Sequence, residues 1–198
     1  MSEERCISVV GKGKLHEQTL VLVPGRNLLT ARGTFTGRFG PPSTMEEDLL
    51  TLAASVYAAD IAVLRGEREG FARSVRLAVP VTNTLAFASV RPILEYALCV
   101  LSGDDWDLEF RYYSGLPEGS YEAPQDDAGV VLFSGGLDSL AYAVEAAGTG
   151  QSLVLVSHDS GNRVTRDSQR ALADYVHRLA RGSIEHLSFR VGGQNSPD

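Results

Sequence analysis

The sequence is poor in cysteine and has no long run of apolar residues. Its 198 residues include two cysteines, Cys6 and Cys99, which lie far apart in apolar surroundings. Two cysteines so placed cannot build a disulfide framework or a zinc site, and we expect both to be buried free thiols. Asp60 and Arg91 interrupt the longest apolar stretches, which fall short of the roughly 20 residues that span a bilayer. Insertion into a membrane is therefore not expected.

Clusters of basic residues are also absent. The formal net charge is -7 at pH 7, and no run of lysine and arginine exceeds two residues. Proteins that bind duplex nucleic acid on their own present a basic face. Residues 1–5 are polar and acidic, which is unlike the basic and then apolar order of a secretory signal. The sequence therefore predicts a cytoplasmic protein and gives no direct evidence for a nucleic-acid partner, although a local basic site stays open.

The first 113 residues alternate between strand and helix patterns, which is typical of an α/β or α+β sandwich. The expected strands are residues 6–10, 19–23, 29–35, 72–80 and 107–113, and the expected helices are residues 44–64 and 84–101. Ser43 or Thr44 can cap the first helix, because Glu46 and Glu47 then lie in its first turn, where acidic side chains are favoured.

Both helices are expected to bury an apolar side against the sheet. In the first helix this side consists of Leu49, Leu50, Leu52, Ala53, Val56, Tyr57 and Ile61. In the second it consists of Leu85, Phe87, Val90, Ile93, Leu94, Ala97 and Leu101. Pro92 is expected to start or kink the second helix, and Gly103 stands where its C-cap would lie.

Residues 115–127 are rich in Gly, Pro, Glu and Asp, which is typical of an exposed linker. We therefore place an accessory domain in residues 1–114 and a second domain in residues 128–198. The second domain has a βαβαβ pattern, with strands at 129–133, 152–157 and 184–191 and helices at 137–147 and 163–181. Continuous apolar strands of this kind indicate a parallel sheet covered on both faces.

The turn between the first strand and helix of this second domain has the composition of a phosphate-binding loop. It comprises residues 133–140, Phe-Ser-Gly-Gly-Leu-Asp-Ser-Leu. A glycine-rich strand-to-helix turn directs backbone N–H groups toward one concave spot at the helix N-terminus, and such a spot binds anions. Gly135 and Gly136 permit close approach, and the hydroxyls of Ser134 and Ser139 can donate to phosphate oxygens.

Other catalytic turns fit these residues less well. Asp138 repels a phosphate, so its role would be to hold the loop or to help place a cation. A Walker A loop requires a lysine, and none lies near Asp138. A nucleophile elbow requires glycine two residues before the serine, and Leu132 occupies that place. The alternative without function is a glycine-rich turn with a serine cap.

Residues 133–139 resemble the signature of the PP-loop (N-type) ATP pyrophosphatases, a superfamily that includes asparagine synthetase, GMP synthetase, tRNA thiolation enzymes and 7-cyano-7-deazaguanine synthase. The resemblance implies a Rossmann-like domain of the adenine nucleotide alpha hydrolase type, which binds ATP with Mg²⁺. The nucleotide-binding residues that it implies are Phe133, Ser134, Gly135, Gly136, Leu137, Asp138, Ser139 and Leu140. It also implies a catalytic role for Asp138.

Residues 156–163, Val-Ser-His-Asp-Ser-Gly-Asn-Arg, are similar to the stretch that follows the second strand in the deazaguanine synthases (the QueC family). Asp159, Gly161 and Arg163 match the pattern of that family. Arg163 enters the helix nearest to the loop, so it is the second catalytic residue that the resemblance implies.

Departures from this pattern leave the substrate open. Ser160 and Val164 stand where the family has Tyr and His. Arg163 can also have a structural role alone, as part of a solvated helix face on which it pairs with Asp167 at i,i+4. His158, at the end of a strand, is expected to be a hydrogen-bonded surface residue.

The resemblance covers residues 129–191. A further domain before such a segment resembles the QueC-like proteins of bacterial antiphage systems of the Qat type. The family also carries additional strands and a four-cysteine Zn²⁺ site, but this sequence has no cysteine after Cys99. We therefore expect an incomplete PP-loop domain, either a fragment or a chain that a partner completes, which alone binds ATP weakly and turns over nothing.

Three functions stay open at this point. The leading one is an AMP-forming ligase that adenylates a substrate carboxylate or amide, in 7-deazaguanine (queuosine) chemistry or in antiviral defence. A tRNA-modifying PP-loop ATPase is the second, although the loop has no cysteine nearby to carry sulfur. The third is a non-catalytic nucleotide-binding or scaffold subunit whose residues 1–114 contact a partner protein.

Overall fold

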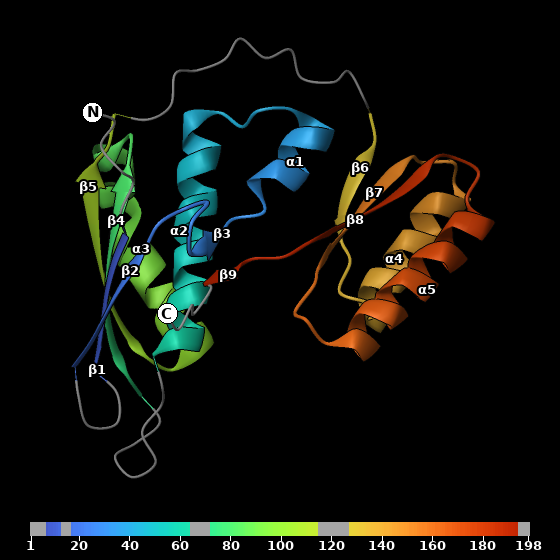
Figure 1. Cartoon of the computed structure of the whole chain (residues 1–198). Coiled ribbons are helices and arrows are strands. Elements are labelled where there is room, and N and C mark those ends of the chain that lie inside the picture. The colour runs from blue at the N-terminus through green and yellow to red at the C-terminus, as the bar shows by residue number, and fades with distance from the viewer. Residues whose placement is uncertain (1–6, 13–16, 64–71, 115–126, 194–198) are drawn as a thin grey trace. The chain divides into compact units, whose positions relative to one another are not determined.

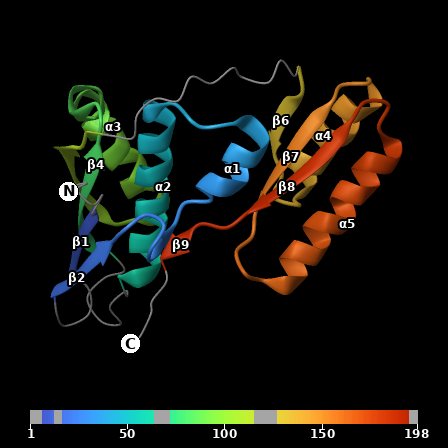
Figure 2. The ribbon, with the colours of Figure 1, turned by 45° about the horizontal axis from the view of Figure 1, so that its top comes forward.

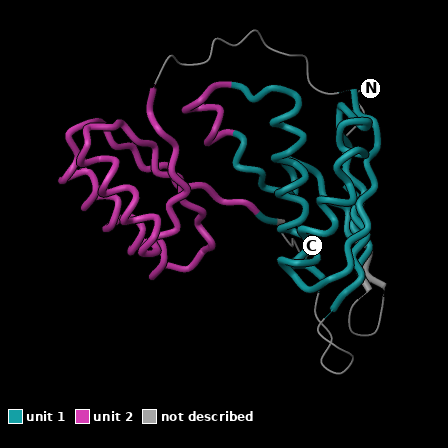
Figure 3. The backbone as a smooth tube through the Cα atoms, turned by 180° about the vertical axis from the view of Figure 1, so that it is seen from behind, with its two compact units in different colours: residues 1–32, 41–121, 192–198 teal, residues 33–40, 122–191 magenta. Residues whose placement is uncertain are grey.

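The chain is a mixed α/β protein (Figure 1), whose described residues form a four-stranded sheet, a three-stranded sheet and a two-stranded one. The computed structural model describes residues 7–12, 17–63, 72–114 and 127–193. Two compact units are present: the first contains residues 1–32, 41–121 and 192–198, and the second contains residues 33–40 and 122–191 (Figure 3). The expected linker and Cys6 lie outside the described residues, apart from Asp127.

The first unit holds a mixed four-stranded sheet with the order β2-β1-β4-β5. Its strands are β1 (Ile7–Lys12), β2 (Glu17–Leu22), β4 (Ser74–Val81) and β5 (Asp105–Tyr112). β1 runs antiparallel to β2 and β4, whereas β4 and β5 are parallel. Val9 lies opposite Leu77, which lies opposite Leu108, and all three side chains are fully buried. This row forms the centre of the core.

Helix α2 (Thr44–Ala62) packs against this sheet and begins as predicted. The Ser43 hydroxyl accepts from the Glu46 amide at 3.3 Å, and the Glu46 carboxylate accepts from the Ser43 amide at 2.8 Å. This reciprocal pair is a capping box, which satisfies two backbone donors at the start of the helix.

The side of α2 that faces the sheet differs from the prediction. Leu49 and Ile61 are 55% and 57% exposed, and the buried residues are Asp48, Thr51, Leu52, Ala54, Ser55, Ala58 and Ala59. Small side chains let the helix approach the strands closely. Thr51 and Ser55 can be buried without loss because their hydroxyls donate to backbone carbonyls four residues earlier, at 2.7 Å and 2.6 Å.

Helix α3 (Thr84–Ser102) connects β4 to β5 and ends as predicted at Gly103, whose φ is +73°. Its start is Thr84, capped by Asn83, so Pro92 lies inside the helix and does not start it. The prediction of a buried apolar side is wrong, since Phe87 is the one buried residue of the helix. Cys99 is exposed, also against expectation. By length and composition, α3 is long and apolar enough to cross a membrane.

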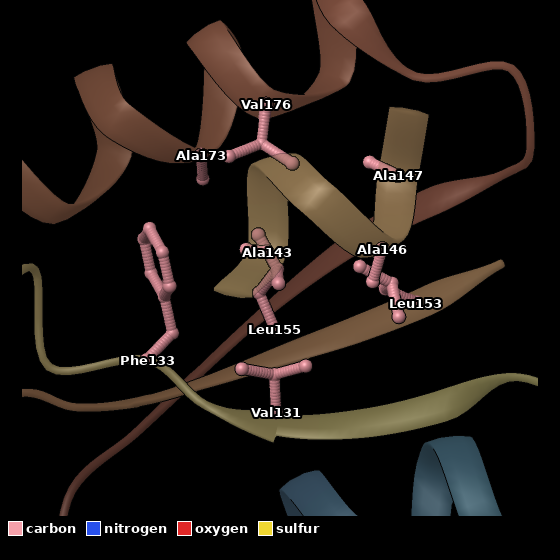
Figure 4. Close-up of a cluster of buried hydrophobic side chains, with 9 residues drawn as sticks. All are labelled: Val131, Phe133, Ala143, Ala146, Ala147, Leu153, Leu155, Ala173 and Val176. Atoms are coloured by element: carbon pink, nitrogen blue, oxygen red, sulfur yellow. The ribbon is translucent and has the colours of Figure 1, made fainter. Parts of the chain in front are cut away.

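The second unit has a parallel three-stranded sheet, β6-β7-β8, and confirms the predicted βαβαβ pattern. The strands are β6 (Gly129–Leu132), β7 (Leu153–His158) and β8 (Ile184–Phe189), and the helices are α4 (Leu137–Gly148) and α5 (Arg163–Leu179). Both helices cover one face of the sheet (Figure 2). Between sheet and helices lies a buried cluster of Val131, Phe133, Ala143, Ala146, Ala147, Leu153, Leu155, Ala173 and Val176 (Figure 4).

The prediction of a strand at residues 29–35 is wrong. Only Leu28–Leu29 (β3) is extended, and it pairs antiparallel with Gly192–Gly193 (β9) in the first unit. Helix α1 (Arg32–Phe39) follows, although threonine and phenylalanine in this stretch favour a strand.

Contacts within the second unit account for α1. The Phe35 ring lies 5.1 Å from that of Phe189, between centroids, and Arg38 pairs with Glu185. Phe35 and Arg38 are three residues apart, so they share one side of a helix, whereas on a strand they would point to opposite faces. Tertiary contacts therefore override the local preference, and α1 lies beside β8 on the face of the sheet opposite α4 and α5 (Figure 2).

Candidate functional site

The carboxyl ends of β6, β7 and β8 meet at one edge of the parallel sheet, where ligands bind in open α/β sheets. β6 leads into the predicted loop and α4, and β7 leads through Asp159–Asn162 into α5. Gln169 of α5 joins the two loops, because its side-chain amide donates to the Ser134 carbonyl at 3.1 Å and lies 3.5 Å from the His158 carbonyl. The two stretches that the sequence singled out are thus brought together.

Gly135 is required by the path of the loop. Its φ is +83°, in the left-handed region that side chains rarely adopt. A Cβ at this position would lie 3.1 Å from the Cγ of Gln169, which is 4% exposed. Conformation and close packing therefore both select glycine here.

The N-terminus of α4 lacks the side-chain cap that α2, α3 and α5 have. Ser43 caps α2, Asn83 caps α3 and Asn162 caps α5 through side-chain oxygens that accept from backbone amides. The N-cap of α4 is Gly136, which has no side chain to do so. The orphan donors of α4 are therefore left for another acceptor.

Most backbone donors of the loop have no acceptor in the described part of the chain. The Gly136 amide donates to the Ser134 hydroxyl at 3.2 Å. For the amides of Leu137, Asp138 and Ser139, the described residues provide no hydrogen-bond acceptor. Three adjacent N–H groups at the positive end of a helix dipole form a site suited to an anion.

The loop itself is open to solvent. Leu137 is 79% exposed, and Ser134, Gly136 and Asp138 are exposed as well. Gly135, Ser139 and Leu140 are half-buried. Phe133 differs from the other predicted nucleotide-binding residues, because its side chain is 1% exposed and belongs to the core (Figure 4). The backbone amide of Phe133 also donates to the Val156 carbonyl, and its carbonyl accepts from the Ser157 hydroxyl, so Phe133 supports the loop from below the site.

Asp159, after β7, is held by several donors. Its carboxylate accepts from the Gly161 amide at 2.9 Å, from Arg190 at 2.9 Å and from Arg166 at 3.4 Å. The Gly161 amide, and after it Arg190, hold the pKa of Asp159 below its usual value. Asp159 therefore organises two arginines at the sheet edge.

Arg163, the second predicted catalytic residue, is the first residue of α5. Its side chain is 85% exposed, and its guanidinium lies 3.5 Å from the Asp167 carboxylate. Within the described residues it has no hydrogen bond to the loop, whereas Arg166, three residues further along α5, is held against Asp159.

Comparisons with known proteins were made against protein-family models, curated proteins and solved structures. None of them matches this chain.

A buried hydrogen-bond relay supports the root of the loop and was missed in the sequence. The Ser157 hydroxyl is fully buried and donates to the Phe133 carbonyl at 2.6 Å. Its oxygen therefore accepts from Nε2 of His186, 2.9 Å away. Burial, followed by the charge of Arg170, lowers the pKa of His186, which keeps the imidazole neutral near pH 7.

Signals for the missed residues differ in strength. Ser157 is a polar residue at the end of the apolar run Leu-Val-Leu-Val, so a buried role could have been suspected. Gln169 lies in a polar helix and gives no local signal, because its partner Ser134 is 35 residues away in the chain.

The resemblance implies a zinc site and a magnesium site, and the residues present suit only the second. Within the described residues no group of three or more His, Cys, Asp or Glu could hold a metal, and Cys99 lies on α3, so a four-cysteine zinc site does not fit. Mg²⁺ prefers oxygen ligands and is often held by one carboxylate together with phosphate oxygens. The exposed carboxylate of Asp138 beside the loop suits that arrangement.

Proposed function

We propose that the edge of the parallel sheet binds the phosphate tail of ATP and serves an AMP-forming adenylation reaction of the PP-loop type. The observation that carries this proposal is the uncapped N-terminus of α4, where adjacent amides lie in an exposed glycine-rich loop. Gly135 in a left-handed conformation, fixed over Gln169, supports it by giving the loop one defined shape.

In the proposed reaction the loop acts on the charge that develops on pyrophosphate. A substrate carboxylate or amide oxygen attacks the α-phosphorus, the bond to the bridging oxygen breaks, and pyrophosphate leaves. The amides of Leu137, Asp138 and Ser139 would stabilise the departing negative charge. Asp138 would hold Mg²⁺, which neutralises charge on the phosphates when bound. Catalysis would depend on positioning and electrostatics.

The narrower assignments follow from the resemblance alone. They are a PP-loop ATP pyrophosphatase domain of the QueC type, a role in 7-deazaguanine chemistry or antiphage defence, and a cytoplasmic location. Arg163 would contact the nucleotide or the substrate from the start of α5, and residues 1–114 would contact a partner protein. Each of these is part of the proposal.

A second candidate is a non-catalytic nucleotide-binding or scaffold subunit. Strand β6 favours it, because within the described residues β6 pairs with β7 alone. Val130 and Leu132 on this strand are 60% and 80% exposed, and the unpaired backbone of an edge strand is a template for pairing with another chain. A partner strand could complete the sheet without any reaction taking place.

Titration calorimetry with ATP, pyrophosphate and AMP, in the presence of Mg²⁺, tests the binding site. We expect ATP to bind with a dissociation constant of about 0.1–1 mM. Pyrophosphate should compete with ATP, and AMP should bind more weakly, since the amides of α4 contact the phosphate tail. AMP binding as tightly as ATP, with no effect of pyrophosphate, would contradict a site for the tail.

Product analysis then separates the two candidates. Adenylation yields AMP and pyrophosphate, and a binding subunit yields neither. We expect the 198-residue chain to release no AMP by itself, and to do so only when the sheet is completed. ADP as the product would rule out attack at the α-phosphorus.

A further inference from the structure

Helix α3 turns its apolar side chains outward. Its outer face consists of Leu85 (83% exposed), Val90 (41%), Ile93 (69%), Tyr96 (71%), Val100 (66%) and Leu101 (83%). Surface helices of soluble domains usually direct such side chains to the core and their charges to water. An outer face of this composition marks a place where the protein contacts something else.

The two charged residues of α3 are both directed toward strand β5. Arg91 contacts Glu95 and Asp107, each at 2.7 Å. Glu95 also accepts from the backbone amide of Leu108, at 2.8 Å, which satisfies a donor on the open edge of β5. The charges of α3 are thus used within the unit, and the outer face carries none.

The connections of α3 prevent it from leaving the sheet to cross a bilayer. Strand β4 ends at Val81 and α3 begins at Thr84, while Ser102 ends α3 and β5 begins at Asp105. The Ser102 hydroxyl also accepts from the Trp106 indole at 2.9 Å. A helix held in a crossover between two paired parallel strands, with such short connections, stays on its sheet.

A membrane surface also suits this helix poorly. Helices that lie in the interface of a bilayer carry lysine and arginine on their polar side, which attract anionic lipids. The polar side of α3 carries one arginine and one glutamate that pair with each other, and the net charge of the chain is -7.

The size of the outer face fits a protein interface. At these exposures a large apolar side chain presents on the order of 100 Å², so the six together present on the order of 600 Å². This area is at the upper end of the roughly 300–600 Å² patch that a single soluble chain leaves exposed. It also approaches the approximately 800 Å² that each partner contributes to a standard interface.

We infer that the outer face of α3 pairs with the same face of a second copy of this chain. A different partner selected by charge would need charges to match, and this face has none. An uncharged apolar face is complementary to itself, which is what a two-fold contact requires. The inference does not depend on nucleotide binding, because α3 belongs to the first unit.

Sedimentation equilibrium of the full chain, over a wide concentration range, tests this inference. We expect a mass of twice the 21.3 kDa of one chain. Ile93→Lys places a charge at the centre of the face and should weaken the dimer at least about tenfold. Leu49→Lys is the matched control, because Leu49 is 55% exposed on α2 and should leave the mass unchanged.

Val100→Lys provides a second variant in case Ile93→Lys disturbs the fold, and circular dichroism establishes that each variant is folded. A wild-type chain that stays monomeric overturns the inference, as does a dimer that both α3 variants leave intact. Flotation of the wild type with phosphatidylcholine vesicles, lost in Ile93→Lys, would assign the face to lipid and would overturn it as well.

Discussion

Gln169 packs against Gly135, and its side-chain amide donates a hydrogen bond to the carbonyl of the neighbouring loop residue Ser134 at 3.1 Å. Helix α5 thereby fixes the shape of a loop that begins helix α4. The relationship explains why a glutamine is buried in a helix whose other polar residues face water, and it makes the loop sensitive to both positions.

Gly135→Ala should distort the loop. The alanine would have to adopt a φ of +83° and would place its Cβ against Gln169, which together cost about 1–3 kcal/mol. We expect ATP affinity to fall at least about tenfold, since a tenfold change corresponds to roughly 1.4 kcal/mol. Calorimetric titration measures it.

Gly148→Ala is the control for this prediction. Gly148 ends the same helix, and a Cβ there meets nothing within 4 Å. ATP affinity should be unchanged and stability unchanged or slightly raised, because alanine favours a helix. Equal effects of the two substitutions would show that glycine at position 135 has no special role.

Gln169→Leu should weaken nucleotide binding without a large loss of stability. Leucine fills most of the space but cannot donate to the Ser134 carbonyl, and the loss of one such hydrogen bond costs about 1 kcal/mol. We expect a weaker ATP titration and faster amide hydrogen exchange in residues 134–139. Unchanged exchange in the loop would mean that Gln169 does not hold it.

The His186 relay predicts a pH dependence of stability. The pKa of His186 is lower in the folded protein than its ordinary value of 6.5. The unfolded chain therefore binds the proton more readily, so the contribution of His186 is complete above pH 6.5 and is lost as the pH falls through the lower folded pKa. The free energy of unfolding, measured with urea, should fall between pH 8 and pH 5, and part of this fall should come from His186.

Glutamine in the variant His186→Gln retains an N–H donor for Ser157 but does not titrate. The part of the fall in unfolding free energy that comes from His186 should therefore disappear. His177→Gln, at an exposed position on α5, is the matched control and should retain it. If the two variants behave alike, His186 is not the group that titrates.

Breaking the buried ion pair between Arg73 and Asp104 should strongly destabilise the first unit. Arg73 is 3% exposed and donates to the fully buried Asp104 from its backbone amide at 2.8 Å and from Nε at 3.1 Å. Arg73→Met would leave that carboxylate buried without its cation, at a cost of about 3–5 kcal/mol. Arg76→Met, which removes a 65% exposed partner of Asp107, should cost at most about 1 kcal/mol. Urea unfolding compares the two, and similar losses would contradict the prediction.

Sequence patterns predicted the second unit well because its signals are local. Buried parallel strands produce continuous apolar runs, and the Gly-Gly turn marks the start of α4. The capping box at Ser43 and the left-handed Gly103 are likewise set by residues within one turn of the helix end.

The errors arose where distant residues decide the outcome. The threonines around Phe35 favour a strand, but Phe189 and Glu185, some 150 residues away, provide the contacts of helix α1. Apart from Asp48 and Leu52, the buried side of α2 is made of alanine and hydroxyl residues, which hydrophobicity does not distinguish from a surface. In the site, the partners of Ser134 and Phe133 come from later elements, so no local pattern could reveal Gln169 or His186.

The pairing of Leu28–Leu29 with Gly192–Gly193, together with the assignment of residues 33–40 to the second unit, interleaves the two halves of the chain. Neither unit is a single continuous stretch of sequence. If the chain were expressed as two pieces divided between residues 114 and 127, each piece would lack a segment that the other carries. Closing a contact between such distant positions is slow. During synthesis on the ribosome, Leu28 and Leu29 must therefore wait until Gly192 and Gly193 have been made before they reach their final neighbours.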